Sequence, residues 1–315
     1  MNIDVSVLIV SYQPDLEKLK KTVISSIRQN NITHQIVIAD DGSKYNYFDE
    51  IKNIFVNEHF TNYIFVTSEI NNGTCLNIYN GLKVCTGMYV KTIAPGDYFF
   101  DENTLHQWVV RAKAYSSDIC FGDTVYYRNT PENGIELIKK KVQPQNISIY
   151  TSDKVKNDDR ILNYIFLKDA IVGSSFLTKK DVMYRYLELI KGRIKYAEDM
   201  VYRIMIIDGL TFNYYSSPVI WYEYGTGIST SGSKKWEETI NKERLICNEI
   251  IKENMNYYGL KKIRICLALN VTKKRKFDFL KYFIFPKLIY WKIMKEKSKK
   301  YTDTDIDFNY LYKLD

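Results

Sequence analysis

The chain of 315 residues is 45% hydrophobic and 26% charged, the balance of a globular protein with one large α/β core and a small appendage. Its net charge of +8 is concentrated in residues 273–300, which carry +9, so a nucleic-acid-binding face on the nearly neutral remainder is excluded. The five cysteines form no CxxC pair and the three histidines all lie in the first third, which excludes a disulfide framework, a zinc site and a histidine-rich metal site.

Strand and helix patterns alternate over the first 125 residues. Continuous apolar runs predict strands and apolar residues at helical spacing predict helices, in the order strand 5–10, helix 16–27, strand 36–39, helix 47–56, strand 63–67, helix 74–85 and strand 88–93. This order predicts a doubly wound, mostly parallel sheet with right-handed crossovers. Ligands bind such sheets at the carboxyl ends of the strands, so we expect the chemistry in the loops that follow them.

The pattern becomes mixed beyond residue 117. Short strands and two helices are predicted up to residue 224, and a Gly/Ser/Thr-rich loop then precedes a polar helix; the helices span residues 179–191, 198–208 and 236–254. We divide the chain into a catalytic domain at residues 1–235 and a C-terminal helical extension at residues 236–315. The last residues, 302–315, are predicted to form a short acidic tail.

Polar motifs occur directly after three of the predicted strands. They are SYQPD at residues 11–15, DDGS at residues 40–43 and APGD at residues 94–97. A Glu198-Asp199 pair opens a predicted helix about a hundred residues later. Each motif alone is compatible with an ordinary turn or helix start, whereas their order and spacing together are specific.

In this order the motifs resemble the family 2 glycosyltransferases of GT-A fold, over roughly the first 230 residues. The resemblance is carried by VSVLIVSYQPD at residues 5–15, IVIADDGS at 36–43, NNGTCLNIYNGLKVCTGMYVKTIAPGD at 71–97 and AEDMVYRI at 197–204. It implies a GT-A domain that moves a sugar from a nucleotide donor to an acceptor hydroxyl. The acceptor is expected to be a growing glycan, either lipid-linked or protein-linked.

The resemblance also implies a nucleotide site in the first two loops. Tyr12 would stack on the base, and the Asp41 carboxylate would accept a hydrogen bond from a ring N–H. Uracil offers that donor at N3 and cytosine does not, so a UDP-sugar is expected; guanine offers one too, which leaves a GDP-sugar open. The other residues assigned to the nucleotide are Ser11, Asn72, Gly73, Asn80, Lys234 and Lys235.

The third loop departs from the family, whose members usually carry a run of aspartates there. Only Asp97 remains, at the position of the last aspartate, which ligates a divalent metal in relatives. Mn²⁺ or Mg²⁺ can bind through one or two carboxylates plus phosphates and waters, so we still expect a metal at Asp97. A second departure is Tyr79, where relatives often carry Arg before the Asn matched by Asn80; phosphate neutralisation would then fall to the metal or to lysines.

The Glu198-Asp199 pair matches the acceptor-side motif of the family, whose aspartate is the general base. A carboxylate suits this role because the acceptor hydroxyl loses its proton as it attacks the anomeric carbon. We assign the base to Asp199 with Glu198 beside it; an i,i+4 ion pair between Asp199 and Arg203 is the alternative. An inverting transfer of one sugar per encounter is expected, because the Gln-x-x-Arg-Trp signature of processive synthases is absent.

A loop rich in glycine and hydroxyl groups precedes Lys234 and Lys235. It suits a mobile flap that closes over the donor and lets one of these lysines reach the diphosphate, although a solvent-exposed loop fits equally.

The basic segment, residues 273–300, interleaves aromatic residues with lysines, including Lys281, Lys287 and Lys292. It is too charged to span a bilayer and predicts a helix on an anionic membrane surface, bent at Pro286. A core-packed helix or a contact between copies of the chain is the alternative. No basic leader precedes the first strand, so we expect a cytoplasmic protein, peripheral on the inner membrane face.

Other enzyme classes fit less well. A sugar nucleotidyltransferase needs a Gly-rich, Arg-containing loop after the first strand, and a nicotinamide dehydrogenase needs G-x-G-x-x-G there; neither is present. A non-catalytic binding or scaffold subunit remains the alternative. Ala94 and Gly96 favour it, and the retained Asp41, Asp97 and Asp199 oppose it.

Overall fold

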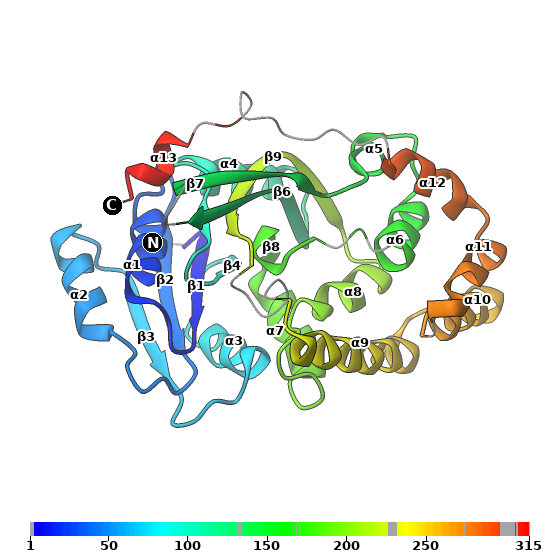
Figure 1. The fold of residues 1–315 in the computed structure, drawn as a ribbon, viewed down its shortest axis with the longest axis horizontal. Helices are drawn as coiled ribbons and strands as arrows, with labels where there is room; N and C mark the ends of the chain where they lie inside the picture. The colour runs from blue at the N-terminus through cyan, green and yellow to red at the C-terminus, as the bar shows by residue number, and fades with distance from the viewer. Residues whose placement is uncertain are drawn as a thin grey trace.

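A computed structural model of the chain describes residues 3–130, 134–167, 169, 171–225, 232–273, 275–296, 306 and 308–314. Its strands form one nine-stranded sheet in the order β3-β2-β1-β4-β8-β6-β9-β5, with β7 paired to β6 (Figure 1). The strands are β1 (Val5–Ser11), β2 (His34–Asp40), β3 (Tyr63–Thr67), β4 (Tyr89–Ile93), β5 (Tyr98–Phe99), β6 (Ile119–Thr130), β7 (Gly134–Gln143), β8 (Phe176–Lys179) and β9 (Phe212–Glu223). The α/β fold class predicted from the sequence is therefore confirmed.

Helices pack against both faces of this sheet. In the first half they are α1 (Leu16–Ile27), α2 (Phe48–Asn57), α3 (Thr74–Leu82), α4 (Thr104–Ala114), α5 (Ile147–Thr151) and α6 (Asn157–Phe166). The 3₁₀ turn η1 (Gly173–Ser175) is followed by α7 (Lys180–Ile190), α8 (Met200–Ile207), α9 (Lys234–Asn254) and α10 (Gly259–Val271). The C-terminal part contains the 3₁₀ turn η2 (Arg275–Leu280), α11 (Lys281–Ile284), α12 (Lys287–Glu296) and α13 (Asn309–Tyr312).

The predicted parallel core is present. β1 pairs in parallel with β2 and β4, and β2 pairs in parallel with β3. Along β1, Leu8 packs into the cluster that contains α3, whereas Val7 and Ile9 pack into the cluster that contains α1, α2 and α4. Successive side chains of a strand point to opposite faces, so the continuous apolar run of Val7 to Val10 in β1 suits a sheet that is covered on both faces.

The middle of the chain contains more sheet than its sequence predicted. β6 and β9 are 12 residues long each and run parallel, while the short β8 lies antiparallel between β4 and β6. The helices predicted at 179–191 and 198–208 are present as α7 and α8, but α5 and α6 were not predicted. Because α8 begins at Met200, Glu198 and Asp199 precede this helix instead of lying within it.

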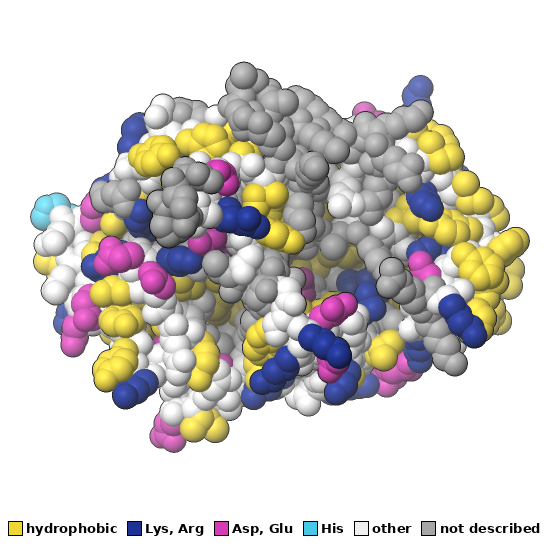
Figure 2. All heavy atoms as spheres, in the orientation of Figure 1, with side chains coloured by type: hydrophobic (Ala, Val, Ile, Leu, Met, Phe, Trp, Pro, Cys, Tyr) yellow, Lys and Arg dark blue, Asp and Glu magenta, His cyan; other side chains and the backbone are white. Residues whose placement is uncertain are grey.

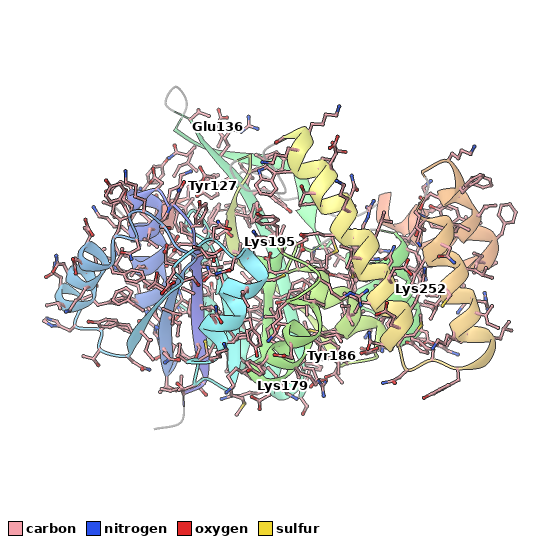
Figure 3. All side chains as sticks on the ribbon, turned by 90° about the horizontal axis from the view of Figure 1, so that it is seen from below. Tyr127, Glu136, Lys179, Tyr186, Lys195 and Lys252 are labelled. Carbon is pink, nitrogen blue, oxygen red and sulfur yellow. The ribbon has the colours of Figure 1, made fainter. Side chains whose placement is uncertain are left out.

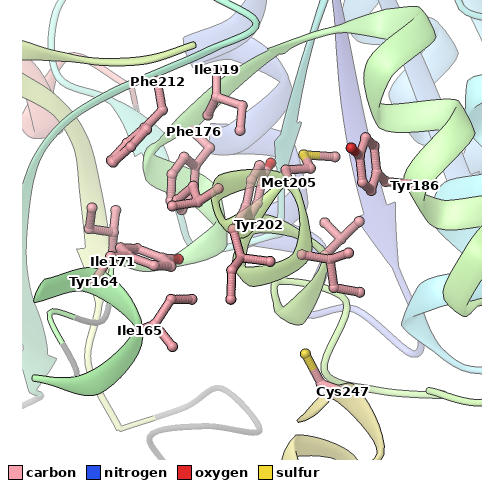
Figure 4. Packing of buried hydrophobic residues seen from close by; sticks show 14 of the residues in the cluster. Ile119, Tyr164, Ile165, Ile171, Phe176, Tyr186, Tyr202, Met205, Phe212 and Cys247 are labelled. Atoms are coloured by element: carbon pink, nitrogen blue, oxygen red, sulfur yellow. The ribbon is translucent and has the colours of Figure 1, made fainter. Parts of the chain in front are cut away.

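One core joins the sheet to the C-terminal helices. Figure 4 shows Tyr202 of α8 against Phe176 of β8, with ring centroids 3.8 Å apart, and Cys247 of α9 beneath them. The same cluster continues through Leu269 of α10 and Leu288 of α12. The helices predicted as a C-terminal extension therefore share the core of the catalytic domain.

One face of the basic segment packs against the rest of the protein. The helical structure is interrupted at Pro286, between α11 and α12, where a bend was predicted. Leu288 and Trp291 are buried, and the Asn146 side chain donates to the Trp291 carbonyl at 3.2 Å. Lys281, predicted as a surface lysine, is instead buried beside Asp278 at 2.6 Å. Among the described residues, no helix is long and apolar enough to cross a membrane.

The chain end returns to the sheet, where only an acidic tail was predicted. Leu311 and Leu314 pack with Tyr98 and Trp221 from β5 and β9, and α13 lies at the opposite end of the molecule from α12 (Figure 1). Burial of apolar side chains such as Leu311 and Leu314 holds the described part of this segment against the sheet.

Candidate active site

Two aspartates at the end of β2 join the first two polar loops. The Asp40 carboxylate is fully buried and accepts hydrogen bonds from the Ser11 hydroxyl at 3.3 Å and from the Ser43 backbone N–H at 2.8 Å. The predicted nucleotide residue Ser11 is itself buried, so its hydroxyl serves this internal contact. Tyr12 beside it is 47% exposed, which leaves its ring accessible to a base.

Asp41 ties this edge of the sheet to the start of α3. Its two carboxylate oxygens accept the backbone N–H groups of Asn72 at 2.9 Å and Gly73 at 2.7 Å. Burial raises the pKa of Asp41, and these two N–H groups offset the shift only in part. Asn80 does not join this group, because it lies two turns along α3, about 10 Å from Gly73 at 1.5 Å per residue. The side chain of Asn80 accepts instead from Lys83 at 3.0 Å.

The loop before α8 contacts α3 directly. Gly73 has φ +92°, and a Cβ there would come within 2.3 Å of the Lys195 side chain, so glycine is required on both counts. The Cys75 backbone N–H donates to the Lys195 carbonyl at 3.0 Å. The positive charge of Lys195 offsets part of the rise in the pKa of Asp41. Figure 3 shows Lys195 beside the α3 ribbon. The donor-side loops and the loop that leads to Glu198 thus form one site.

Glu243 of α9 holds that loop in place. Its buried carboxylate accepts three successive backbone N–H groups, from Lys195 at 2.9 Å, Tyr196 at 3.1 Å and Ala197 at 2.7 Å. No motif pointed to this residue, since it lies some 45 positions further along the chain in a polar helix. Only the fold brings it under the loop.

Glu198 and Asp199 are carboxylates with strongly shifted acidity. Burial raises the pKa of Asp199 to about 6, and it raises that of Glu198 further. The neighbouring charges of Asp199 and Glu243 add to the shift of Glu198, whereas Arg203 lowers the pKa of Asp199. In this arrangement Glu198 retains a proton more readily and Asp199 is the better proton acceptor near neutral pH.

The alternative reading of Asp199 as an ion-pair partner of Arg203 does not match the geometry. Within the described residues no salt bridge joins the two side chains. The Arg203 guanidinium donates instead to the Ile165 carbonyl at 3.3 Å and the Asn248 side chain at 3.2 Å. Arg203 therefore acts on Asp199 only through its charge.

Asp97 is enclosed by its own loop and by neighbouring elements. The side chain is buried, its carbonyl accepts from the Thr22 hydroxyl at 3.0 Å, and its carboxylate accepts from the Glu223 backbone N–H. Burial raises the pKa of Asp97, while Lys91, which is fully buried on β4, lowers it in part. The η1 turn joins the surroundings of Asp97 to those of Glu198. Its Ser174 lies beside Asp97, and a Cβ on its Gly173 would meet Glu198 at 3.4 Å.

Comparison with known proteins is consistent with this geometry. The family model described as glycosyl transferase family 2 matches residues 6–173, which is more than half of the chain. The chain belongs to this family. The enzyme is thus a glycosyltransferase, and the scaffold alternative is set aside. No curated protein sequence matches the chain.

Solved structures show the same fold. The glycosyltransferase is similar to S. aureus TarS 1-349, with a TM-score of 0.60 and 15% identity over 92% of this chain and 78% of that one. It is similar to the UDP-GlcNAc complex of TarS 1-349, with a TM-score of 0.60 and 14% identity over 93% and 79%, and to the UDP complex, with a TM-score of 0.54 and 12% identity over 92% and 78%. Against the longer TarS chain, this enzyme spans 47% of the length.

The remaining predicted residues lie at the margin of the site. Lys234 and Lys235 begin α9 and are exposed. The next residue, Trp236, packs edge-on against Tyr196 with ring centroids 5.0 Å apart, so both lysines stand near the loop that leads to Glu198. Most of the predicted flap, residues 226–231, lies outside the described residues.

The described residues offer a divalent cation few protein ligands around Asp97, because they contain no group of three or more His, Cys, Asp or Glu side chains that could hold a metal. Mg²⁺ commonly keeps several waters and binds through one or two carboxylates together with substrate phosphates, so a single aspartate such as Asp97 is compatible with it. The donor set is oxygen-based, as both Mg²⁺ and Mn²⁺ prefer.

Proposed function

We propose that the enzyme is an inverting glycosyltransferase that moves one sugar from a UDP-sugar to a hydroxyl group of a growing glycan. One observation carries this proposal: the start of α3, which is tied to Asp41, is hydrogen-bonded to the loop that ends in Glu198 and Asp199. A nucleotide site and a carboxylate of raised pKa therefore share one edge of the sheet. Similar solved structures include complexes of TarS with UDP and UDP-GlcNAc, which supports a uridine nucleotide as donor.

The residues suggest how donor binding works. The exposed Tyr12 ring would stack on the base, and the remaining lone pairs of Asp41 would accept the uracil N3–H. Lys195, together with Lys234 or Lys235, would neutralise the diphosphate, since the position before Asn80 holds Tyr79 and no arginine. Mn²⁺ or Mg²⁺ held by Asp97 would stabilise the charge that develops on the departing diphosphate.

The transfer itself needs one base and no covalent intermediate. The acceptor oxygen forms a bond to the anomeric carbon as the bond from that carbon to the diphosphate oxygen breaks, which inverts the configuration. Asp199 accepts the hydroxyl proton, and UDP departs with the electron pair. Glu198 keeps its own proton and would orient the acceptor by donating a hydrogen bond.

The proposal is tested with the full chain and a panel of nucleotide sugars. We expect slow, metal-dependent release of UDP from a UDP-sugar without acceptor, and binding of UDP about ten-fold or more tighter than of CDP. Cytosine would face Asp41 with a lone pair, a buried mismatch that costs about 1–3 kcal/mol. Calorimetry of UDP, CDP and GDP measures this order, and a preference for CDP would contradict the proposed base contact.

The basic segment would hold the enzyme on an anionic membrane surface, close to a lipid-linked acceptor. The end of the molecule formed by α10–α12 exposes apolar side chains among lysines, as the right-hand side of Figure 2 shows. The most exposed are Leu260, Ile263, Phe279, Phe283, Ile289, Tyr290 and Ile293, all at least 50% exposed. Apolar side chains inserted among lysines that attract anionic lipids are typical of peripheral membrane proteins.

Point substitutions separate this role from folding, because deletion would also remove buried residues such as Leu288. Phe283→Glu should abolish flotation with vesicles of anionic lipid, and V56E on the distant helix α2, where Val56 is 60% exposed, is the matched control. Binding should weaken as salt is raised. If Phe283→Glu leaves vesicle binding intact, or neutral vesicles bind equally, the exposed face serves another contact, such as one between copies of the chain.

A further inference from the structure

The glycine before Asp97 faces a glutamate across the sheet. β5 pairs antiparallel with β9, with Tyr98 opposite Trp221 and Phe99 opposite Ile220. Continuing this register places Gly96 opposite Glu223, the last residue of β9. Directly opposite side chains of an antiparallel pair lie on the same face of the sheet, so Glu223 reaches over the backbone of Gly96.

The Glu223 carboxylate fills the space that a side chain at position 96 would need. Gly96 has φ +98°, and a Cβ built there would come within 2.9 Å of Glu223 Oε2. The Tyr127 hydroxyl fixes this backbone by donating to the Gly96 carbonyl at 2.7 Å. An aspartate at position 96 would therefore be strained and would collide with a carboxylate that is already there.

Glu223 and Asp97 together form a pair of buried carboxylates. The Glu223 side chain is 9% exposed, and its backbone N–H donates to the Asp97 carboxylate. Ser174 is 9% exposed and lies within hydrogen-bond reach of the Asp97 carboxylate. Oxygen atoms of Asp97, Glu223 and Ser174 are thus gathered around this loop.

A lysine ammonium neutralises the Glu223 carboxylate. Lys18, in the first turn of α1, places Nζ 2.6 Å from Glu223 Oε2, and its side chain lies next to Gly96. This lysine is partly exposed, with 34% of its side chain open to solvent, so it can leave without opening the core. The other nearby cation, Lys91, is enclosed beneath Asp97 and donates to the Thr92 carbonyl.

We infer that Glu223 supplies the second carboxylate of the divalent-cation site that begins with Asp97, and that Lys18 occupies the cation position when no divalent ion is bound. The inference rests on the proposed function, which places a metal at Asp97. It explains how one aspartate in this loop can be sufficient. The second carboxylate comes from β9, and two carboxylates with the donor phosphates and water complete an oxygen-ligand set.

Titration of Mn²⁺ into the full-length protein with saturating UDP tests this inference, with free Mn²⁺ followed by electron paramagnetic resonance. Asp97→Asn and Glu223→Gln should each weaken Mn²⁺ binding by about ten-fold or more, as loss of groups that tune a metal site does. Lys18→Met should tighten it several-fold, because the competing ammonium is gone. Lys113→Met, which breaks the ion pair with Asp4 elsewhere on the molecule, should change nothing.

The outcomes separate the inference from the proposed function. If the unmodified protein binds no Mn²⁺ in the presence of UDP, the metal assigned to Asp97 is wrong. If Asp97→Asn abolishes binding while Glu223→Gln and Lys18→Met bind as the unmodified protein does, the roles of Glu223 and Lys18 are wrong and that of Asp97 stands. If Glu223→Gln does not fold, as thermal unfolding would show, the sign of the Lys18→Met effect decides: unchanged or weaker binding contradicts the inference.

Discussion

The two pairs of adjacent acidic residues in the candidate active site differ in what surrounds them: Asp40 and Asp41 are buried, whereas Glu198 and Asp199 are half-buried. Asp40 and Asp41 accept hydrogen bonds from hydroxyl and backbone N–H groups of three loop segments. Glu198 and Asp199 lie before α8 next to the carboxylate of Glu243, and burial raises the pKa of both. The balance of donors and neighbouring charges therefore separates the two pairs. The donors around Asp40 and Asp41 tie three loop segments together, whereas the carboxylate of Glu243 near Glu198 and Asp199 helps to raise the pKa of both residues.

The largest expected effect falls on the second pair. Asp199→Asn should lower sugar transfer by about 10²-fold or more, the order of a lost general base, and leave UDP affinity nearly unchanged. Steady-state kinetics combined with UDP calorimetry measures both quantities. Glu198→Gln is the matched comparison and should be milder. If Glu198→Gln is the more damaging change, the base has been assigned to the wrong residue of the pair.

A smaller effect is expected from the first pair, on binding and stability and not on proton transfer. Asp41→Asn turns an amide N–H₂ towards the N–H of Asn72 or Gly73, a buried mismatch that costs about 1–3 kcal/mol. We expect a lower free energy of unfolding in urea and UDP binding weakened by about ten-fold. Asp15→Asn is the control, because Asn caps the start of α1 as well as Asp does. Equal effects of the two substitutions would contradict a special role for Asp41.

The smallest expected effect is a change in the pH dependence of sugar transfer. It tests most directly how the two pairs of acidic residues differ. Transfer needs ionised Asp199, so activity should fall as the pH drops through about 6. The charge of Glu243 raises the pKa of Asp199; Glu243→Gln removes that charge and should move the acid limb of kcat to lower pH. The value of kcat at neutral pH should fall several-fold, because the loop over residues 195–197 loses one acceptor oxygen.

Glu249→Gln is the matched control for this shift, since Glu249 is an exposed residue of the same helix that pairs with Lys252 and Lys273. Its pH profile should equal that of the unmodified enzyme. A loss of activity in Glu243→Gln without any shift of the acid limb would mean that Glu243 only supports the loop and does not tune the base.

Much of the donor side could be predicted from the sequence because its signals are local. The apolar run of β1, the polar residues that follow it and the Asp-Asp turn lie within short segments, and strand–helix alternation fixes that the ends of parallel strands meet at one edge. The proposed general base could be assigned through the motif around Glu198. The assignments of Ser11 and Asn80 gain no support from the geometry, because the sequence does not say which polar side chains an interior hydrogen bond will use.

The contacts between distant segments depend on the tertiary structure. Glu243 lies under the loop before α8, Glu223 lies over Gly96, and the chain end packs beside β5, and none of these pairings has a local signal. The same holds for the basic segment, whose pattern of aromatic and lysine residues does not reveal which face is buried. Hydrophobic periodicity determines which elements form, since it depends on neighbours in the chain. The partner of each buried charge is decided only by the folded structure, because it depends on strand register and on packing between segments far apart in the chain.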